Sequence, residues 1–172
     1  MQRKDMTKIF SRALLVLYLL FLSWLVLFKL SFNFSTLLNY HHRSLNLVPF
    51  AAPSIVNGKI NYGEMIDNCL FFIPFGVLLN LNFKKVSFLR KLSSVLLFSL
   101  TAEIIQYIFA IGATDITDVI TNTLGGFLGL ELYSLSNKYI KDKKLDRVII
   151  SVGTLLLVLL IFIHVNHHFA RR

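Results

Sequence analysis

Five polar side chains lie in segments that are otherwise as apolar as a membrane span. They are Glu103, Gln106, Asp115, Asp118 and Asn122. Carboxylates at membrane depth are costly and usually mark a binding or proton-transfer site. In a low-dielectric setting, Glu103 has the chemistry of a general acid or base, with Asp118 as a second carboxylate or a metal ligand.

The same side chains repeat at helical spacing, which gives each of two helices one polar or small stripe. The first stripe consists of Ser99, Glu103 and Gln106, and the second of Asp118, Asn122, Gly125 and Gly129. The short connection 111–114 makes these helices antiparallel neighbours, so we expect the stripes to meet. The small-xxx-small spacing of the glycines favours helix packing over ligand binding, either within the chain or against a second copy.

The composition is that of an integral membrane protein. The 172 residues are 55% hydrophobic and include 16 Phe, and the mean hydropathy is +0.66. A small soluble domain could not bury so much apolar surface. The net charge of +9 would suggest nucleic acid in a soluble protein, but here the basic residues lie between apolar spans, so we expect no nucleic-acid partner. The single cysteine, Cys69, is interpreted as a packing residue.

Five apolar stretches are each about the ~20 residues that a membrane-crossing helix needs. They are residues 9–30, 65–83, 89–111, 116–136 and 147–165. The sequence therefore predicts an all-α bundle of about five transmembrane helices that forms a single membrane domain over residues 1–172. A long outer loop joins the first two helices. The first span has no small-residue cleavage site, which favours an anchor over a signal peptide.

The basic residues predict the orientation. Thirteen of the eighteen Lys and Arg fall in the N-terminal arm and in the connections around 84–91 and 138–147. By the positive-inside rule these segments are cytoplasmic, so the N-terminus is inside and the C-terminus outside. All the polar site residues then belong to the outer half of the membrane.

Other polar residues are expected at the same outer side. Asp67 and Asn68 begin the second span, and Arg43 and Asn46 lie in the long outer loop. Arg43 is the cation best placed to face the acids. The adjacent pair 41–42, both His, would point apart, so we interpret them as interface residues rather than metal ligands.

Four motifs occur in a recognisable order. They are Asn46-Leu-Val-Pro-Phe50, Asn68-x-x-x-Phe-Ile-Pro-Phe-Gly76, Glu103-x-x-Gln106 and Asp115-x-x-Asp118-x-x-x-Asn122-Thr-x-Gly125. Over residues 40–135 the chain resembles the VanZ-like family. The resemblance implies a small multi-pass protein of the bacterial cytoplasmic membrane, associated in some members with resistance to glycopeptide antibiotics such as teicoplanin. It implies no catalytic residues.

Two functions are compatible with these residues. We favour a polar outer-leaflet cavity that binds an envelope lipid, a lipid-linked cell-wall precursor or a lipoglycopeptide. Its candidate ligand-binding residues are Arg43, Asn46, Asp67, Asn68, Glu103, Gln106, Asp115, Asp118 and Asn122. Outward helix N-termini favour an anionic group, whereas the carboxylates favour an amine or a bridging divalent cation. The alternative is a membrane enzyme that uses Glu103 and Asp118 as acid and base or as metal ligands.

Structural roles compete with these functions. Asp115 can cap the following helix, and Glu103, Gln106 and Asn122 can form hydrogen bonds between helices. The sequence assigns no residue to a metal. It leaves open the ligand, any cofactor, the oligomeric state, including a homo-oligomer, and whether resistance is the native role.

Overall fold

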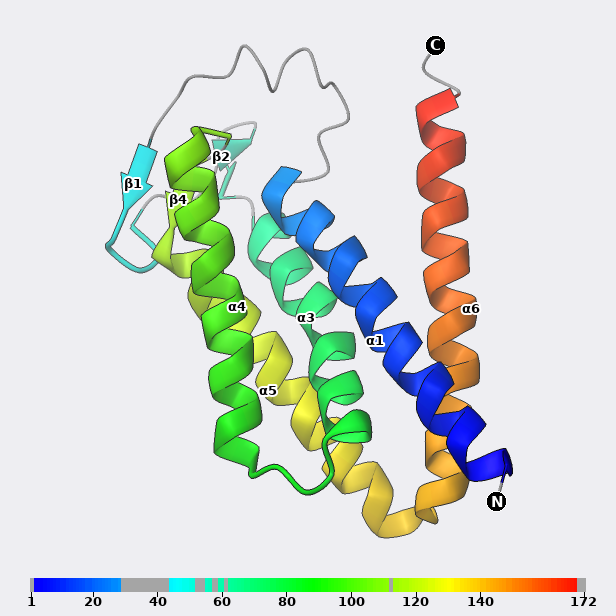
Figure 1. Cartoon of the computed structure of the whole chain (residues 1–172). Helices are drawn as coiled ribbons and strands as arrows, with labels where there is room; N and C mark the ends of the chain where they lie inside the picture. Colours follow the sequence, from blue (N-terminus) through cyan, green and yellow to red (C-terminus); the bar gives the residue numbers. More distant parts are fainter. Residues whose placement is uncertain are drawn as a thin grey trace.

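The computed structural model describes residues 2–28, 44–51, 55–56, 59–60, 62–111 and 113–169. Its helices are α1 (Gln2–Phe28), α3 (Gly63–Asn82), α4 (Phe88–Phe109), α5 (Ile116–Tyr139) and α6 (Asp142–Phe169). They run up and down the long axis of a bundle, with the two chain ends at opposite ends of it (Figure 1). The predicted all-α bundle is confirmed, and each expected span overlaps one of these helices.

In the part of the chain that the structure describes, three helices are long and apolar enough to cross a membrane. They are Met6–Phe28, Gly63–Asn82 and Phe88–Phe109. Large apolar side chains such as Leu97, Ile104 and Ile108 are exposed on the outside of the bundle, where a bilayer would cover them. Crossing by α5 and α6, and the orientation of the bundle, remain predictions.

The helix α3 lies at the centre and packs most closely on α5 (Figure 1). Glycines permit this approach: a Cβ atom built on Gly125 would lie 2.1 Å from the backbone oxygen of Cys69, and one on Gly129 would lie 2.0 Å from that of Ile73. On α3, a Cβ atom built on Gly76 would lie 2.1 Å from the backbone oxygen of Gly126. The predicted packing role of the glycines is therefore confirmed, and it operates within the chain.

Apolar side chains from all five helices fill the space around α3. Phe72 is completely buried, and its ring contacts those of Phe75 and Phe98 edge-on. The helix α1 is fixed to α3 by the Tyr18 hydroxyl, which donates to the backbone oxygen of Phe71 at 2.6 Å. This packing holds the Gly63 end of α3 in a fixed position against α1 and α5.

Short strands, which the sequence did not predict, lie at one end of the bundle. The strand β1 (Ser44–Asn46) pairs in parallel with β4 (Ala113–Asp115), and β2 (Ile55–Val56) pairs with β3 (Lys59–Ile60). At the end of α4, Ala110 takes a left-handed conformation with φ 53°, which turns the chain into β4. The register places Asn46 opposite Asp115.

The other end of the bundle is rich in basic residues. In the turn between α3 and α4, the Lys84 ammonium bonds the Asp146 carboxylate of α6 at 2.7 Å. Partial burial lowers the pKa of Lys84, but its hydrogen bonds to Asp146 and Tyr133 outweigh this effect and the pKa is raised. The link ties α6 to the rest of the bundle.

Candidate functional site

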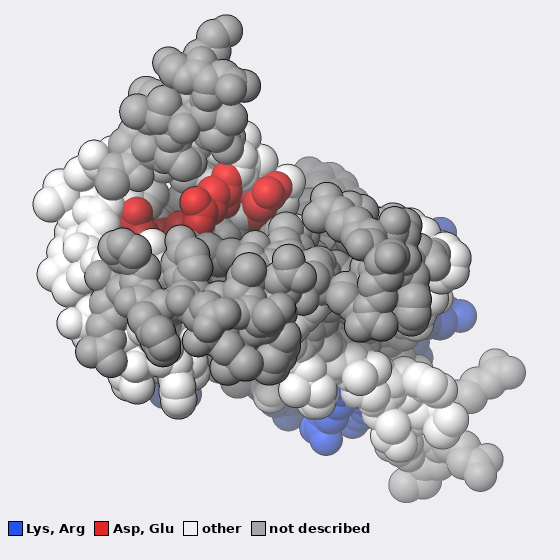
Figure 2. Space-filling model, turned by 90° about the horizontal axis from the view of Figure 1, so that it is seen from above, with Lys and Arg blue, Asp and Glu red and all other residues white. Residues whose placement is uncertain are grey.

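Acidic side chains gather at the end of the bundle where α3 and α5 begin. Figure 2 looks onto this end and shows Asp and Glu side chains clustered on this face, while the Lys and Arg side chains in view lie toward other edges of the molecule. Glu64 lies in the first turn of α3 and Asp118 in the first turn of α5. Helix N-termini carry partial positive charge, so these two positions stabilise carboxylates.

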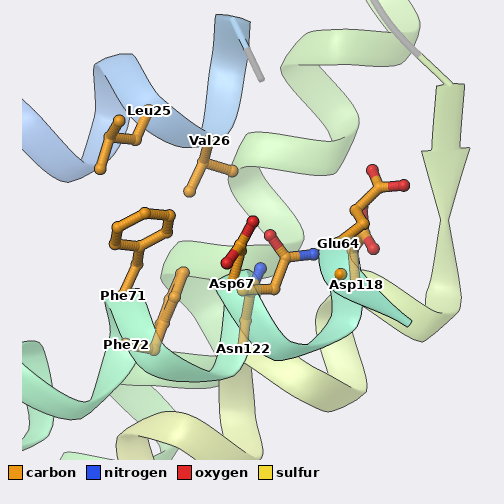
Figure 3. A pocket seen from close by; sticks show the side chains of 10 residues that line it. Leu25, Val26, Glu64, Asp67, Phe71, Phe72, Asp118 and Asn122 are labelled. Atoms are coloured by element: carbon orange, nitrogen blue, oxygen red, sulfur yellow. The ribbon is translucent and has the colours of Figure 1, made fainter. Parts of the chain in front are cut away.

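A pocket of about 370 Å³ opens between α1, α3 and α5, and we call it the acidic pocket. It is lined by Leu25, Val26, Gly63, Glu64, Asp67, Asn68, Phe71, Phe72, Asp118 and Asn122. The apolar side chains of α1 and the two phenylalanines form one side, and the polar groups gather on the other (Figure 3). One wall suits an apolar chain or stem, and the opposite wall suits a polar head group.

The polar wall of the acidic pocket extends from the surface into the bundle. Asp67 is exposed, Asp118 is 5% exposed and Asn122 is 0% exposed. The Asn122 amide nitrogen donates to the Ser99 hydroxyl of α4 at 2.9 Å, so the two predicted stripes do meet. Among the described residues, the Asn122 side-chain oxygen and the Asn68 amide nitrogen are buried without hydrogen-bond partners. Unsatisfied buried polar atoms are rare, so these two are candidate ligand contacts.

Glu103 and Asp115 form a separate junction between α4 and α5. The Glu103 Oε2 atom accepts a hydrogen bond from the backbone N–H of Asp115 at 3.0 Å. Asp115 caps α5, because its Oδ1 atom accepts from the backbone N–H of Thr117 at 2.7 Å. Its Oδ2 atom accepts from the Asn46 amide at 3.0 Å. The predicted cap is thus confirmed, and one carboxylate joins the cap to the β1 segment.

The motif around Pro49 docks on the same junction. The Ala51 N–H donates to the Val48 oxygen at 3.2 Å and closes a turn. Phe50 has φ 59° at the third position of this turn, a strained conformation for a residue with a side chain. Its N–H donates to the Thr117 hydroxyl at 3.1 Å, which ties the turn to the first residues of α5.

A second pocket of about 300 Å³ lies on the other side of this junction. It is lined by Leu45, Leu47, Leu100, Glu103, Ile104, Tyr107, Thr114, Asp115, Ile116 and Val119. We expected a single polar patch, and the residues of that patch are distributed over these two described pockets. Asp67, Asn68, Asp118 and Asn122 line the acidic pocket, whereas Glu103 and Asp115 line this apolar one.

Two further candidates lie elsewhere. Gln106 is 0% exposed and its amide donates to the backbone oxygen of Val26 at 3.0 Å, so it joins α4 to α1. Arg43 lies outside the described residues, as do both histidines at 41–42. Within the described part of the chain, no three His, Cys, Asp or Glu side chains are grouped to hold a metal ion.

Sequence reasoning missed Glu64, which contributes a third carboxylate to the acidic pocket. The signal was present, because Glu64, Asp67, Asn68 and Phe71 follow helical i, i+3, i+4, i+7 spacing. That spacing marks one face of a helix. The partner elements that close the pocket could not be inferred from this spacing alone.

A pair of Glu103 variants separates a structural role from an acid–base role. Glu103→Gln keeps an oxygen that accepts from the Asp115 N–H, so we expect it to retain the stability and activity of the unaltered chain. Glu103→Ala leaves that partly buried N–H unpaired, which costs about 1–3 kcal/mol. Thermal unfolding in detergent measures the cost. Lost activity in the Gln variant at unchanged stability would instead support acid–base chemistry.

Comparisons with known proteins agree on one family. The VanZ/LLP1 family model matches residues 15–137, which include the expected core of 40–135 and also the second half of α1. Protein VanZ of Enterococcus faecium is 66% identical over 156 residues, or 91% of this chain and 93% of that protein. No solved structure matches the chain significantly.

Proposed function

Because this chain belongs to the VanZ/LLP1 family of membrane proteins, we propose that it binds an amphiphilic envelope molecule in the acidic pocket. The ligand is an envelope lipid, a lipid-linked cell-wall precursor or a lipoglycopeptide. Through this binding the protein contributes to resistance to glycopeptide antibiotics of the teicoplanin type, from a multi-pass position in the bacterial cytoplasmic membrane.

The two-sided lining of the acidic pocket carries this proposal. Phe71 and Phe72 offer an apolar wall, opposite Asp67 and the buried Asn122. Ligand pockets typically combine apolar walls with a few polar groups that fix orientation. An amphiphile meets both requirements, since its chain and its head group need opposite surroundings.

The alternative of a membrane enzyme is less well supported. It needs Glu103 and Asp118 to act on one substrate, yet these residues line different pockets. Glu103 also has a structural task, since it accepts the backbone N–H that begins α5. Binding without covalent chemistry therefore agrees better with the geometry.

Resistance measurements test the proposal in cells. In a susceptible host that expresses the chain, Asp67→Asn should lower the teicoplanin concentration tolerated toward that of cells without the protein, because the head-group contact is weakened. The matched control is Asp142→Asn, an exposed carboxylate in the first turn of α6 at the opposite end. Equal membrane levels of both variants must be verified by immunoblot. Full resistance with Asp67→Asn would contradict a role for the acidic pocket.

A further inference from the structure

We propose that the acidic pocket holds its amphiphile through an uncharged group that both donates and accepts a hydrogen bond, namely an amide or a hydroxyl beside the hydrocarbon chain. This inference rests on the proposed function and specifies the chemistry of the ligand at the polar wall. It assigns Asn68 and Asn122 as the two residues that recognise this group.

Two side-chain atoms of opposite hydrogen-bonding character carry the inference. The Asn68 amide nitrogen is a donor and the Asn122 side-chain oxygen is an acceptor, and both are buried without a partner in the part of the chain that the structure describes. Asn68 belongs to α3 and Asn122 to α5, and both line the acidic pocket. Buried polar atoms without partners are rare and costly. Two of them in one pocket indicate a ligand that satisfies both.

The Asn122 side chain is held so that its oxygen remains for a ligand. It is 0% exposed, and Figure 3 shows it beside Asp67 in the pocket. Its amide nitrogen donates to the Ser99 hydroxyl of α4 at 2.9 Å. Because this bond uses the nitrogen, the oxygen is the atom that Asn122 offers to a bound group.

The packing of α3 on α5 brings the two asparagines to the same place. A Cβ atom built on Gly125 would lie 2.1 Å from the backbone oxygen of Cys69, so the two helix backbones touch there. Cys69 follows Asn68 directly, and Gly125 lies three residues after Asn122, which is about one helical turn. The donor and the acceptor therefore lie beside a point of closest approach between the helices.

A donor paired with an acceptor selects an uncharged group. A phosphate diester or a carboxylate can accept from Asn68 but has no proton for Asn122, and an ammonium can donate to Asn122 but has no acceptor for Asn68. An amide or a hydroxyl has both. The carboxylates do not alter this choice, since Glu64 and Asp118 each take part in an interaction within the molecule.

The apolar wall places the hydrocarbon chain next to this group. Phe71 and Phe72 follow Asn68 at i+3 and i+4 on α3, so the three side chains share one face of the helix. Leu25 and Val26 of α1 line the pocket with them. An amide or hydroxyl bonded to Asn68 would thus have its attached chain against the phenylalanines.

Matched probes test the inference on the purified full chain in nanodiscs. The first pair is N-octylacetamide and octyl acetate, which differ in one N–H, and the second is octanol and its methyl ether, which differ in one O–H. We expect the N–H or O–H member of a pair to bind about tenfold more tightly, because its partner leaves the Asn122 oxygen unpaired. Titration of empty nanodiscs subtracts partitioning into the bilayer.

The two pairs also identify the source of the hydrogen bonds. Discrimination within the first pair alone would support the inference and name an amide, and discrimination within the second alone would support it and name a hydroxyl. Equal binding within both pairs would show that the two atoms hold water only, which overturns the inference while the proposed lipid binding stands. If none of the four probes bound saturably, the proposed function would fail with it.

Asn68→Leu links the recognition to the pocket. The substitution removes a donor that has no partner among the described residues, so without probe the thermal midpoint should be equal or higher, while the favoured probe should bind about tenfold more weakly. Asn137→Leu, at an exposed position of α5, is the matched control and should change neither. Unchanged affinity in Asn68→Leu would overturn the inference. A lower midpoint without probe would do so too, because it would reveal a structural partner.

Discussion

Gly129→Ala should prevent the protein from accumulating in a folded form. The added Cβ would lie 2.0 Å from the backbone oxygen of Ile73, where no flexible side chain can move aside. Overpacked cores usually lose 1–3 kcal/mol, so an obstruction by backbone should cost about 3 kcal/mol or more. For a chain of this length the midpoint of thermal unfolding would fall by roughly 6–12 °C. Size-exclusion chromatography and thermal unfolding in detergent measure both effects.

The chain contains a matched control in α6. A Cβ atom on Gly153 would approach only the Leu14 side chain, at 3.2 Å, and a small rotation of that side chain relieves the contact. Since alanine favours a helix over glycine by about 1 kcal/mol, Gly153→Ala should be nearly neutral or stabilising. If Gly129→Ala were as stable as Gly153→Ala, the close packing of α3 on α5 would be wrong.

Asp115→Ala should be the most damaging substitution among the polar candidates. Its carboxylate both caps α5 through the Thr117 N–H and holds the Asn46 amide. Losing a cap costs about 0.5–2 kcal/mol, and losing the partner of a partly buried amide adds about 1–3 kcal/mol. We expect lower thermal stability and faster proteolysis of the segment 44–51, measured by limited digestion and mass spectrometry.

A double-mutant cycle tests the hydrogen bond between Asn46 and Asp115. If Asn46 acts through Asp115, then Asn46→Ala combined with Asp115→Ala should cost less than the sum of the single substitutions, with a coupling of about 0.5–3 kcal/mol. Asp115→Asn should be intermediate, because it keeps one acceptor for the cap but presents an amide to Asn46. Strict additivity of the two alanine substitutions would contradict the contact.

The glycine contacts between α3 and α5 and the Asp115 junction explain how the acidic pocket is held open and oriented. The glycine contacts fix α3 against α5 below the pocket, and the Asp115 junction fixes the start of α5 beside it. Binding sites on rigid elements lose less entropy when a ligand is ordered. The site therefore depends on residues that do not line it.

The structure changed the interpretation of several residues for physical reasons. Asp115 was expected either as a cap or as a ligand contact, and its two hydrogen bonds support the first role. Glu103 and Asp118 were expected in one patch, and they line different pockets among those described. Helical spacing gives only the face of a helix and not what packs on that face. Asn46 reaches Asp115 through a strand pairing that joins positions 69 residues apart, which no local pattern predicts.

The sequence by itself determined the helical membrane bundle and the packing role of the glycines, and it predicted a functional site around Glu103, Asp118 and Asn122. Hydropathy and helical period depend on neighbouring residues, so they can be read along the chain. Only the tertiary structure decided that α3 supplies the partner for the glycines, that Glu64 joins Asp118 in one pocket, and that Glu103 lies in another. Those facts depend on how helices dock, because docking joins side chains that are distant in sequence.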